Sequence, residues 1–93
     1  MKIFIGGLLP SRQQRIRELY PGVDFTFASD QEGRRRWLSR ARGADVAIID
    51  QGRTSHTTTK LLQSKGVQYQ LADGNAAIQR LIESALDNEM EPE

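Results

Sequence analysis

The chain has 93 residues, 38% of them hydrophobic and 27% charged, and a net charge of +1. This length and composition are typical of one globular domain with a single modest core. The absence of cysteine and the presence of one histidine exclude a disulfide framework and the usual zinc sites.

The first predicted strand covers residues 2–5, which are mostly apolar and are followed by two glycines. Ser11 followed by Gln14 is a capping-box pattern, which predicts that a helix begins there. Apolar side chains recur at i, i+3 and i+4 on one face of this helix, and Pro21-Gly22 ends it.

The second strand is predicted over residues 23–27, where apolar and polar side chains alternate. This alternation gives the strand one face more buried than the other and favours a place at the edge of a sheet. Ser29 followed by Glu32 is a second capping box. The helix after it carries Trp37 on its apolar face and five arginines elsewhere, and it ends at Gly43.

Residues 46–49 form a continuous apolar run, which is typical of a central parallel strand covered on both faces. A polar loop over residues 50–56 leads into a third helix, which ends at Lys65-Gly66. Alternating apolar residues predict a fourth strand over 67–71. The last helix has the most regular amphipathic pattern in the chain, and Asp73 is its predicted cap.

Strand and helix therefore alternate four times, in one domain at residues 1–87 that is followed by an acidic tail at residues 88–93. Strands separated by helices of this length form a parallel sheet with right-handed crossovers. We predict an α/β domain with strand order 2-1-3-4, a small Rossmann-like or flavodoxin-like fold of three layers. No apolar run approaches the roughly 20 residues of a membrane helix, and the N-terminus lacks the apolar stretch of a signal peptide. We therefore expect a cytoplasmic protein without membrane contact.

The predicted ligand site lies between the first and third strands, where the strand order reverses. In open parallel sheets, ligands bind beyond the carboxyl ends of the strands at this point. The loops there, residues 6–11 and 50–56, are rich in glycine or hydroxyl side chains, and each leads into a helix N-terminus that favours an anion. The expected binding residues are Gly6, Gly7, Ser11, Arg12, Asp50, Arg53, Thr54, Ser55, His56, Thr57 and Lys60.

Each of these features also has a simpler structural interpretation. Gly6-Gly7 does not extend to a G-x-G-x-x-G motif, and a tight strand-to-helix turn uses glycine as readily. The hydroxyl-rich run at 54–60 is either an anion cradle, with His56 and Lys60 on one helix face, or an N-cap with a solvated first turn. Asp50 either accepts ligand hydroxyls, caps the following turn, or pairs with His56 in a catalytic site.

The arginine-rich helix suggests a second kind of site. Its exposed arginines would contact nucleic-acid phosphates or another partner, and Trp37 would be a stacking platform for a base. The arginines expected to make these contacts are Arg34, Arg35, Arg36 and Arg40. Alternatively, they form a solvated helix face and Trp37 belongs to the core. Residues 1–60 carry eleven Lys or Arg against six Asp or Glu, a net charge of +5, whereas residues 61–93 carry two against six, a net of −4.

Three short motifs resemble the bacterial domain of unknown function 2325. They are Ile3-Phe4-Ile5-Gly6-Gly7, Ala44-Asp45-Val46-Ala47-Ile48-Ile49, and Ser55-His56 with Lys60. The resemblance extends from about Lys2 to Leu86 and implies a compact Rossmann-like domain of bacteria or their phages, with no established activity. It implies functional roles for Gly6, Gly7, Ser55, His56 and Lys60, whereas the run Thr57-Thr58-Thr59 departs from the family pattern.

The sequence thus favours a binding module for a small phosphorylated ligand, such as a nucleotide or a nucleotide-derived signal. One alternative is a phage or bacterial inhibitor that docks on a host protein or nucleic acid through the arginine-rich helix. Another is an enzyme that acts on a phosphoester, with His56 as acid, base or phosphoryl acceptor. The sequence predicts no metal and no cofactor, and the small size of the domain favours a homodimer.

Overall fold

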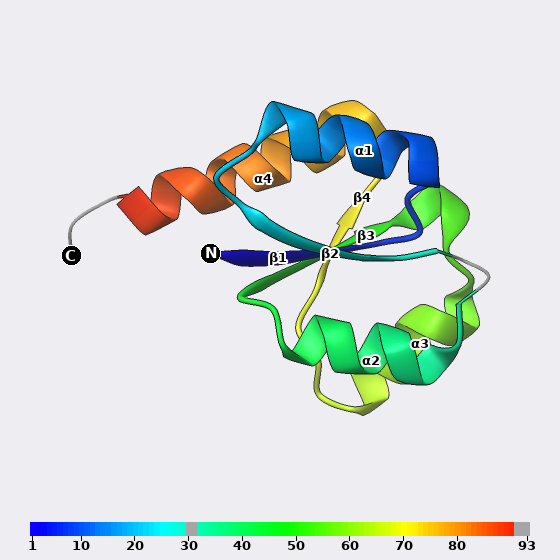
Figure 1. The fold of residues 1–93 in the computed structure, drawn as a ribbon. Coiled ribbons are helices and arrows are strands. Elements are labelled where there is room, and N and C mark those ends of the chain that lie inside the picture. Colours follow the sequence, from blue (N-terminus) through cyan, green and yellow to red (C-terminus); the bar gives the residue numbers. More distant parts are fainter. Residues whose placement is uncertain (30–31, 91–93) are drawn as a thin grey trace.

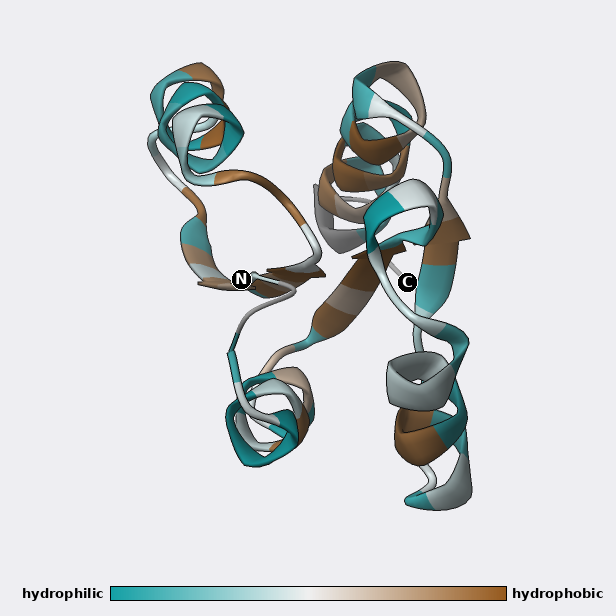
Figure 2. Cartoon of the chain, turned by 90° about the vertical axis from the view of Figure 1, so that its right-hand side faces the viewer, coloured by the Kyte–Doolittle hydropathy of each residue, from teal (hydrophilic) through white to brown (hydrophobic). Residues whose placement is uncertain are grey.

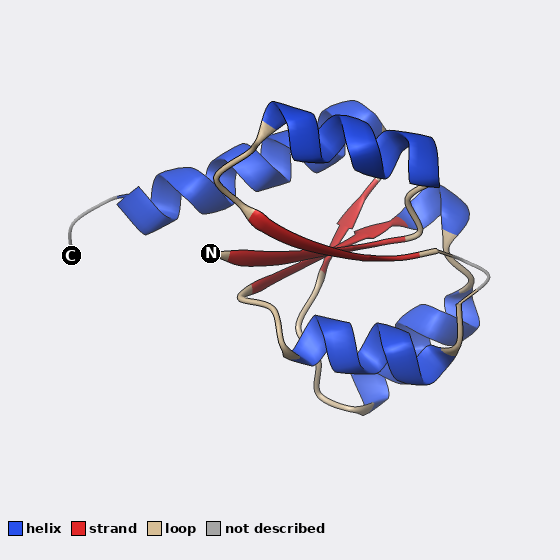
Figure 3. Ribbon diagram, viewed as in Figure 1, coloured by secondary structure: helices blue, strands red, loops and turns tan. Residues whose placement is uncertain are grey.

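The computed structural model describes residues 1–29 and 32–90. They form an α/β fold of three layers, in which α1 and α4 cover one face of a parallel sheet and α2 and α3 cover the other (Figures 1 and 3). The elements in chain order are β1 (Lys2–Gly6), α1 (Pro10–Leu19), β2 (Asp24–Ala28), α2 (Arg34–Arg42), β3 (Val46–Asp50), the 3-10 turn η1 (Gln51–Arg53), α3 (His56–Ser64), β4 (Gln70–Ala72) and α4 (Asn75–Met90).

The four strands are parallel and lie in the order β2-β1-β3-β4, which confirms the predicted topology. At the centre, Ile3 of β1 is opposite Phe25 of β2 on one side and Val46 of β3 on the other. The strand order therefore reverses between β1 and β3, as predicted. This position matters because the loops that follow β1 and β3 meet at the same edge of the sheet.

The core divides into two clusters, one on each face of the sheet. Ile3 and Ile5 point toward α1 and α4, whereas Phe4 points toward α2 and α3, because successive side chains of a strand alternate between faces. Ile48 and Ile49 of β3 divide in the same way and are fully buried. Figure 2 views the carboxyl ends of the strands and shows brown, hydrophobic segments in the strands and in α4, whereas α1 and α2 are largely teal and hydrophilic.

Both edge strands differ from the central pair. The Asp24 N–H and the Ala28 carbonyl of β2 bond toward β1, so the backbone groups of Phe25 and Phe27 point away from the sheet. The Arg40 guanidinium of α2 covers one of them by donating to the Phe27 carbonyl. β4 begins three residues after its predicted start at 67, and its Leu71 is 49% exposed.

Two helix starts differ from the predicted capping boxes. α1 begins at Pro10, with Leu9 as an N-cap that makes no side-chain hydrogen bond, because proline is pre-organised for the first helical position. The predicted cap at Ser11 is therefore wrong. The Glu32 carboxylate does accept the Ser29 N–H at 2.9 Å, which is one of the two hydrogen bonds of a capping box. However, α2 begins only at Arg34, so this hydrogen bond lies ahead of the helix and does not cap it.

The last helix also starts and ends later than predicted. The Ile78 N–H donates to the carbonyl of Gly74, which has φ +88°, so the helix turn opens at Gly74 and not at the predicted cap Asp73. α4 continues to Met90, into the predicted tail, and residues 91–93 lie outside the described residues. None of the helices in the described part of the chain is both long and apolar enough to cross a membrane.

Candidate functional site

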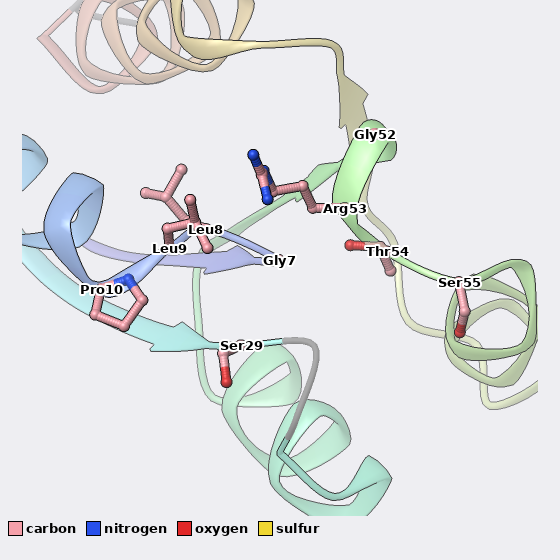
Figure 4. Close-up of a pocket in the computed structure, with 9 residues that line it drawn as sticks. All are labelled: Gly7, Leu8, Leu9, Pro10, Ser29, Gly52, Arg53, Thr54 and Ser55. Carbon is pink, nitrogen blue, oxygen red and sulfur yellow. The ribbon is translucent and has the colours of Figure 1, made fainter.

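A cavity of about 680 Å³ opens at the carboxyl edge of the sheet, at the predicted switch point between β1 and β3 (Figure 4). Its volume is within the range of about 300–1,000 Å³ that is usual for small-molecule sites. The lining residues come from the ends of three strands: Gly7, Leu8, Leu9 and Pro10 follow β1, Ser29 follows β2, and Gly52, Arg53, Thr54 and Ser55 follow β3. The structure thus brings together four predicted site residues, which are Gly7, Arg53, Thr54 and Ser55.

The two glycines after β1 have different roles. Gly7 lines the cavity with φ +88°, and a Cβ there would lie 2.5 Å from Thr54 Oγ1. This residue therefore lets the β1–α1 loop approach the loop after β3. Its N–H donates to the Ala28 carbonyl at 2.8 Å, so it is not free to bind an anion. Gly6 lies under Trp37 instead, where a Cβ would be 2.2 Å from the indole ring, and it does not line the cavity.

Polar groups after β3 form one wall of the cavity. Arg53 is exposed, and its side chain extends from η1 toward Leu8 and Leu9 (Figure 4). Thr54 Oγ1 is buried and has no hydrogen-bond partner among the residues that the structure describes. Ser55 is the N-cap of α3 and accepts the Thr58 N–H at 3.3 Å, which confirms its structural interpretation.

The start of α3 leaves backbone donors free beside this wall. The first N–H groups of α3 with an intrahelical acceptor are those of Thr58 and Thr59, which both donate to the Ser55 carbonyl. The N–H groups of His56 and Thr57, at the very start of the helix, have no intrahelical acceptor. These two groups and the positive end of the helix dipole favour a negative charge near Ser55. The backbone of this turn can therefore contribute to the site even though its longer side chains do not.

The other predicted cradle side chains lie outside the cavity. His56, Thr57 and Lys60 are exposed on α3, which is anchored by the fully buried Leu62. Lys60 precedes Leu62 by two residues, or about 200° around a helix of 3.6 residues per turn, so it faces away from the core contact. Ser11 and Arg12 are likewise exposed on α1 and do not line the cavity.

Asp50 ends β3 with a side chain that the structure leaves without a partner. Only 7% of Asp50 is exposed, it caps η1 without a side-chain hydrogen bond, and no described residue forms a hydrogen bond or ion pair with its carboxylate. Asp50 is thus at the capping position of the turn, but its side chain does not make the capping hydrogen bond. The alternative of a catalytic pair with His56 has no support in the described residues, because no hydrogen bond or ion pair joins the two side chains, and His56 is exposed at the start of α3.

The sequence-based prediction missed the apolar wall of the cavity. Leu8 is almost fully buried, whereas Leu9 is 39% exposed at the mouth beside Pro10. One sequence feature could have identified Leu9 as a cavity residue. It is an apolar side chain between the glycines that end the strand and the start of the helix, where no helix face buries it. Ser29 was missed because it follows the edge strand β2 and not one of the two strands at the predicted switch point. Gly52 lies in the predicted loop 50–56 but was not among the expected binding residues.

The arginine-rich helix is partly committed to the fold. Trp37 is buried, its ring lies edge-on to Phe4 with centroids 5.8 Å apart, and its Nε1 donates to the Ser29 carbonyl. The stacking-platform prediction is therefore wrong. Arg40 donates to the Glu32 carboxylate at 3.0 Å as well as to β2. Arg36 is exposed and pairs with the Glu32 carboxylate at 3.7 Å, and Arg42 is exposed and donates to the Lys65 carbonyl. Arg34 and Arg35 are exposed and have no ion pair among the described residues.

No protein-family model matches the chain, and no curated protein or solved structure is similar to it. The topology defines the class of the domain, a small Rossmann-like α/β fold with a cavity at its switch point. The resemblance to the bacterial domain of unknown function 2325 is carried by its short sequence motifs alone.

Proposed function

We propose that the domain is a cytoplasmic binding module for a small anionic, phosphorylated ligand, such as a nucleotide or a nucleotide-derived signal. The observation that carries this proposal is the cavity at the switch point, which has one apolar and one polar wall. Leu8, Leu9 and Pro10 suit a flat, weakly polar group such as a base. The opposite wall, with Arg53 and Thr54, suits a phosphate.

The polar wall offers three kinds of contact to a phosphate. The Arg53 guanidinium has forked N–H donors for two phosphate oxygens. Thr54 Oγ1 is buried without a partner, and a buried hydroxyl is stabilised when it gains one. The free backbone N–H groups at the start of α3 add the positive end of a helix dipole. We therefore expect Arg53 to contribute most to affinity.

The test is a thermal-shift screen of the wild type and of Arg53→Gln against nucleotides, cyclic dinucleotides and inorganic phosphate. A ligand at 100 times its Kd stabilises the wild type by about 2.7 kcal/mol. Loss of a charge-assisted hydrogen bond worth about 1.5–3 kcal/mol should weaken binding roughly 10- to 150-fold in Arg53→Gln.

Arg12→Gln is the matched control, because Arg12 is an exposed arginine outside the cavity. We expect this variant to bind as the wild type does. The proposal is contradicted when no phosphorylated compound shifts the melting temperature, or when Arg53→Gln and Arg12→Gln bind equally well.

A second candidate function is docking on a host protein or nucleic acid through α2. Its first turn consists of three exposed arginines, with no acidic residue and no side-chain cap. Positive charges there meet the positive end of the helix dipole, at a cost of about 0.3–1 kcal/mol each. Glu32 compensates Arg36 at 3.7 Å, whereas Arg34 and Arg35 have no ion pair among the described residues and are open to an anionic partner.

A gel-shift titration with short oligonucleotides tests the nucleic-acid form of this candidate. Replacing Arg34, Arg35 and Arg36 by Gln should weaken binding. It should also reduce the slope of log K against log salt concentration by roughly 1 for each phosphate that is no longer neutralised. Replacing Arg53 should leave it unchanged. The absence of any shift at low salt would exclude nucleic acid as the partner.

A further inference from the structure

Asp50 has no charged or hydrogen-bonding counterpart among the described residues. It is the sole buried polar or charged residue in the part of the chain that the structure describes, and its carboxylate has no hydrogen bond and no ion pair there. The carboxylate of an aspartate that is more than nine-tenths buried is stabilised when a cation or hydrogen-bond donors reach it. Asp50 is the N-cap residue of η1, but its side chain makes no capping hydrogen bond.

A second carboxylate lies beside it. Ala72 of β4 is opposite Asp50 in the sheet, so Asp73 follows at the same carboxyl edge. The Oδ1 atoms of Asp50 and Asp73 are each 3.8 Å from the point that a Cβ on Gly52 would occupy. They are therefore at most twice that distance, 7.6 Å, apart. Both oxygens therefore lie near the place that a side chain at position 52 would occupy, and Asp73 is exposed to solvent.

We propose that Asp50 and Asp73 bind a hard divalent cation of the Mg²⁺ type beside Gly52. An ion at the midpoint would be at most 3.8 Å from each Oδ1. Mg²⁺ binds oxygen at about 2.0–2.1 Å, and an oxygen reached through a coordinated water lies roughly 4 Å from the ion. This spacing fits a partly hydrated ion with one direct carboxylate and one that accepts from its water.

The donor set selects the class of metal. Only oxygen donors are present, which favours Mg²⁺, Mn²⁺ or Ca²⁺ over zinc. The described residues contain no group of three or more His, Cys, Asp or Glu side chains placed for a metal. Mg²⁺ does not require such a group, because it usually keeps several waters and uses one or two carboxylates.

The cation site adjoins the cavity without depending on it. Gly52 lines the cavity and is near both carboxylates, so a bound cation would lie close to an anionic ligand. Cations commonly reach phosphates in this way. The site is nevertheless defined by Asp50 and Asp73 alone, and cation binding can be measured with no anion present.

The experiment uses the full chain, freed of metal with EDTA and titrated with Mn²⁺, which is detected by electron paramagnetic resonance, followed by displacement with Mg²⁺. We expect one Mn²⁺ per chain, displaced by Mg²⁺, and binding weakened by about tenfold or more in Asp50→Asn and in Asp73→Asn. Asp87→Asn is the matched control, because this exposed aspartate lies far along α4, and it should bind as the wild type does.

Asp73→Asn keeps the test decisive if Asp50→Asn does not fold, because Asp73 is exposed and outside the core. The proposal is overturned if the wild type binds no Mn²⁺, or if Asp73→Asn and Asp87→Asn bind it equally. A parallel nucleotide titration in EDTA tests the anionic ligand separately. Failure of the metal site and failure of the proposed function are thereby distinguished.

Discussion

The contact between Gly6 and Trp37 yields the sharpest test of the fold. In Gly6→Ala, the new Cβ would lie 2.2, 2.7 and 3.0 Å from three carbons of the Trp37 ring. Trp37 is 2% exposed, and its ring is held edge-on against Phe4 on β1. The ring cannot move outward without breaking this packing and the hydrogen bond from Nε1 to the Ser29 carbonyl. One methyl group should therefore displace α2 from the sheet.

Overpacking of a core usually costs about 1–3 kcal/mol. Because three ring carbons lie within 3.0 Å, we expect the upper end of this range for Gly6→Ala. At about 4–8 °C for each kcal/mol in a domain of this size, the melting temperature should fall by roughly 12–24 °C. Urea unfolding followed by far-UV circular dichroism gives the free energy of unfolding directly.

Two further variants identify the cause of the loss. Gly22→Ala is the control, because nothing lies within 4 Å of its Cβ position, and it should stay within about 0.5 kcal/mol of the wild type. A double-mutant cycle with Trp37→Phe should show coupling, so that Gly6→Ala costs less when the larger ring is absent. The reasoning is refuted if Gly6→Ala and Gly22→Ala are equally stable, or if the cycle shows no coupling.

The remaining predictions concern a helix cap, a titrating phenol and a turn. Ser55→Ala removes the hydroxyl that accepts the Thr58 N–H and should cost about 1 kcal/mol in urea unfolding, whereas Ser55→Asn should retain most of the stability. The pKa of Tyr20 is raised above 10.0, first by burial and then by the charge and hydrogen bond of Glu83. The folded state therefore holds this proton more tightly than the unfolded state does. The contribution of the Tyr20 phenol to the free energy of unfolding is full below pH 10.0 and is lost as the pH rises above that value. Tyr20→Phe should remove this part of the alkaline decline in stability, and an unchanged curve would contradict the assignment. Gly7→Ala places a side chain at φ +88° and 2.5 Å from a buried hydroxyl, so it should both lower the melting temperature and abolish nucleotide binding.

The sequence was sufficient for the order of the strands but not for their ends. The apolar run at 46–49 and the helical spacers predict a parallel sheet, and right-handed crossovers leave few alternatives. Strand length at an edge is less determined, because only one neighbour holds it. Val67 and Tyr69 pack against the core ahead of β4, so their alternation with polar residues resembles that of a strand although no ladder forms there.

The predicted site was correct in place and partly wrong in its residues. The switch point follows from topology, so the loops after β1 and β3 were found. Spacing puts His56 and Lys60 on one face of a helix, but it does not say which way that face points. Leu62 decides this by anchoring α3 to the sheet. The pairing of Asp50 with Asp73 could not be read from the chain, because it depends on β4 lying beside β3.

The guanidinium of Arg40 ties the stability of a helix to the exposed rim of the sheet. While α2 is folded, this group occupies the Phe27 carbonyl, one of the backbone groups of β2 that no strand pairs. When the end of α2 frays, this carbonyl joins the other backbone groups of β2 that point away from the sheet, and an edge of this kind can pair with a strand from another molecule. Variants that lose Arg40 should be recognised by loss of solubility before loss of secondary structure.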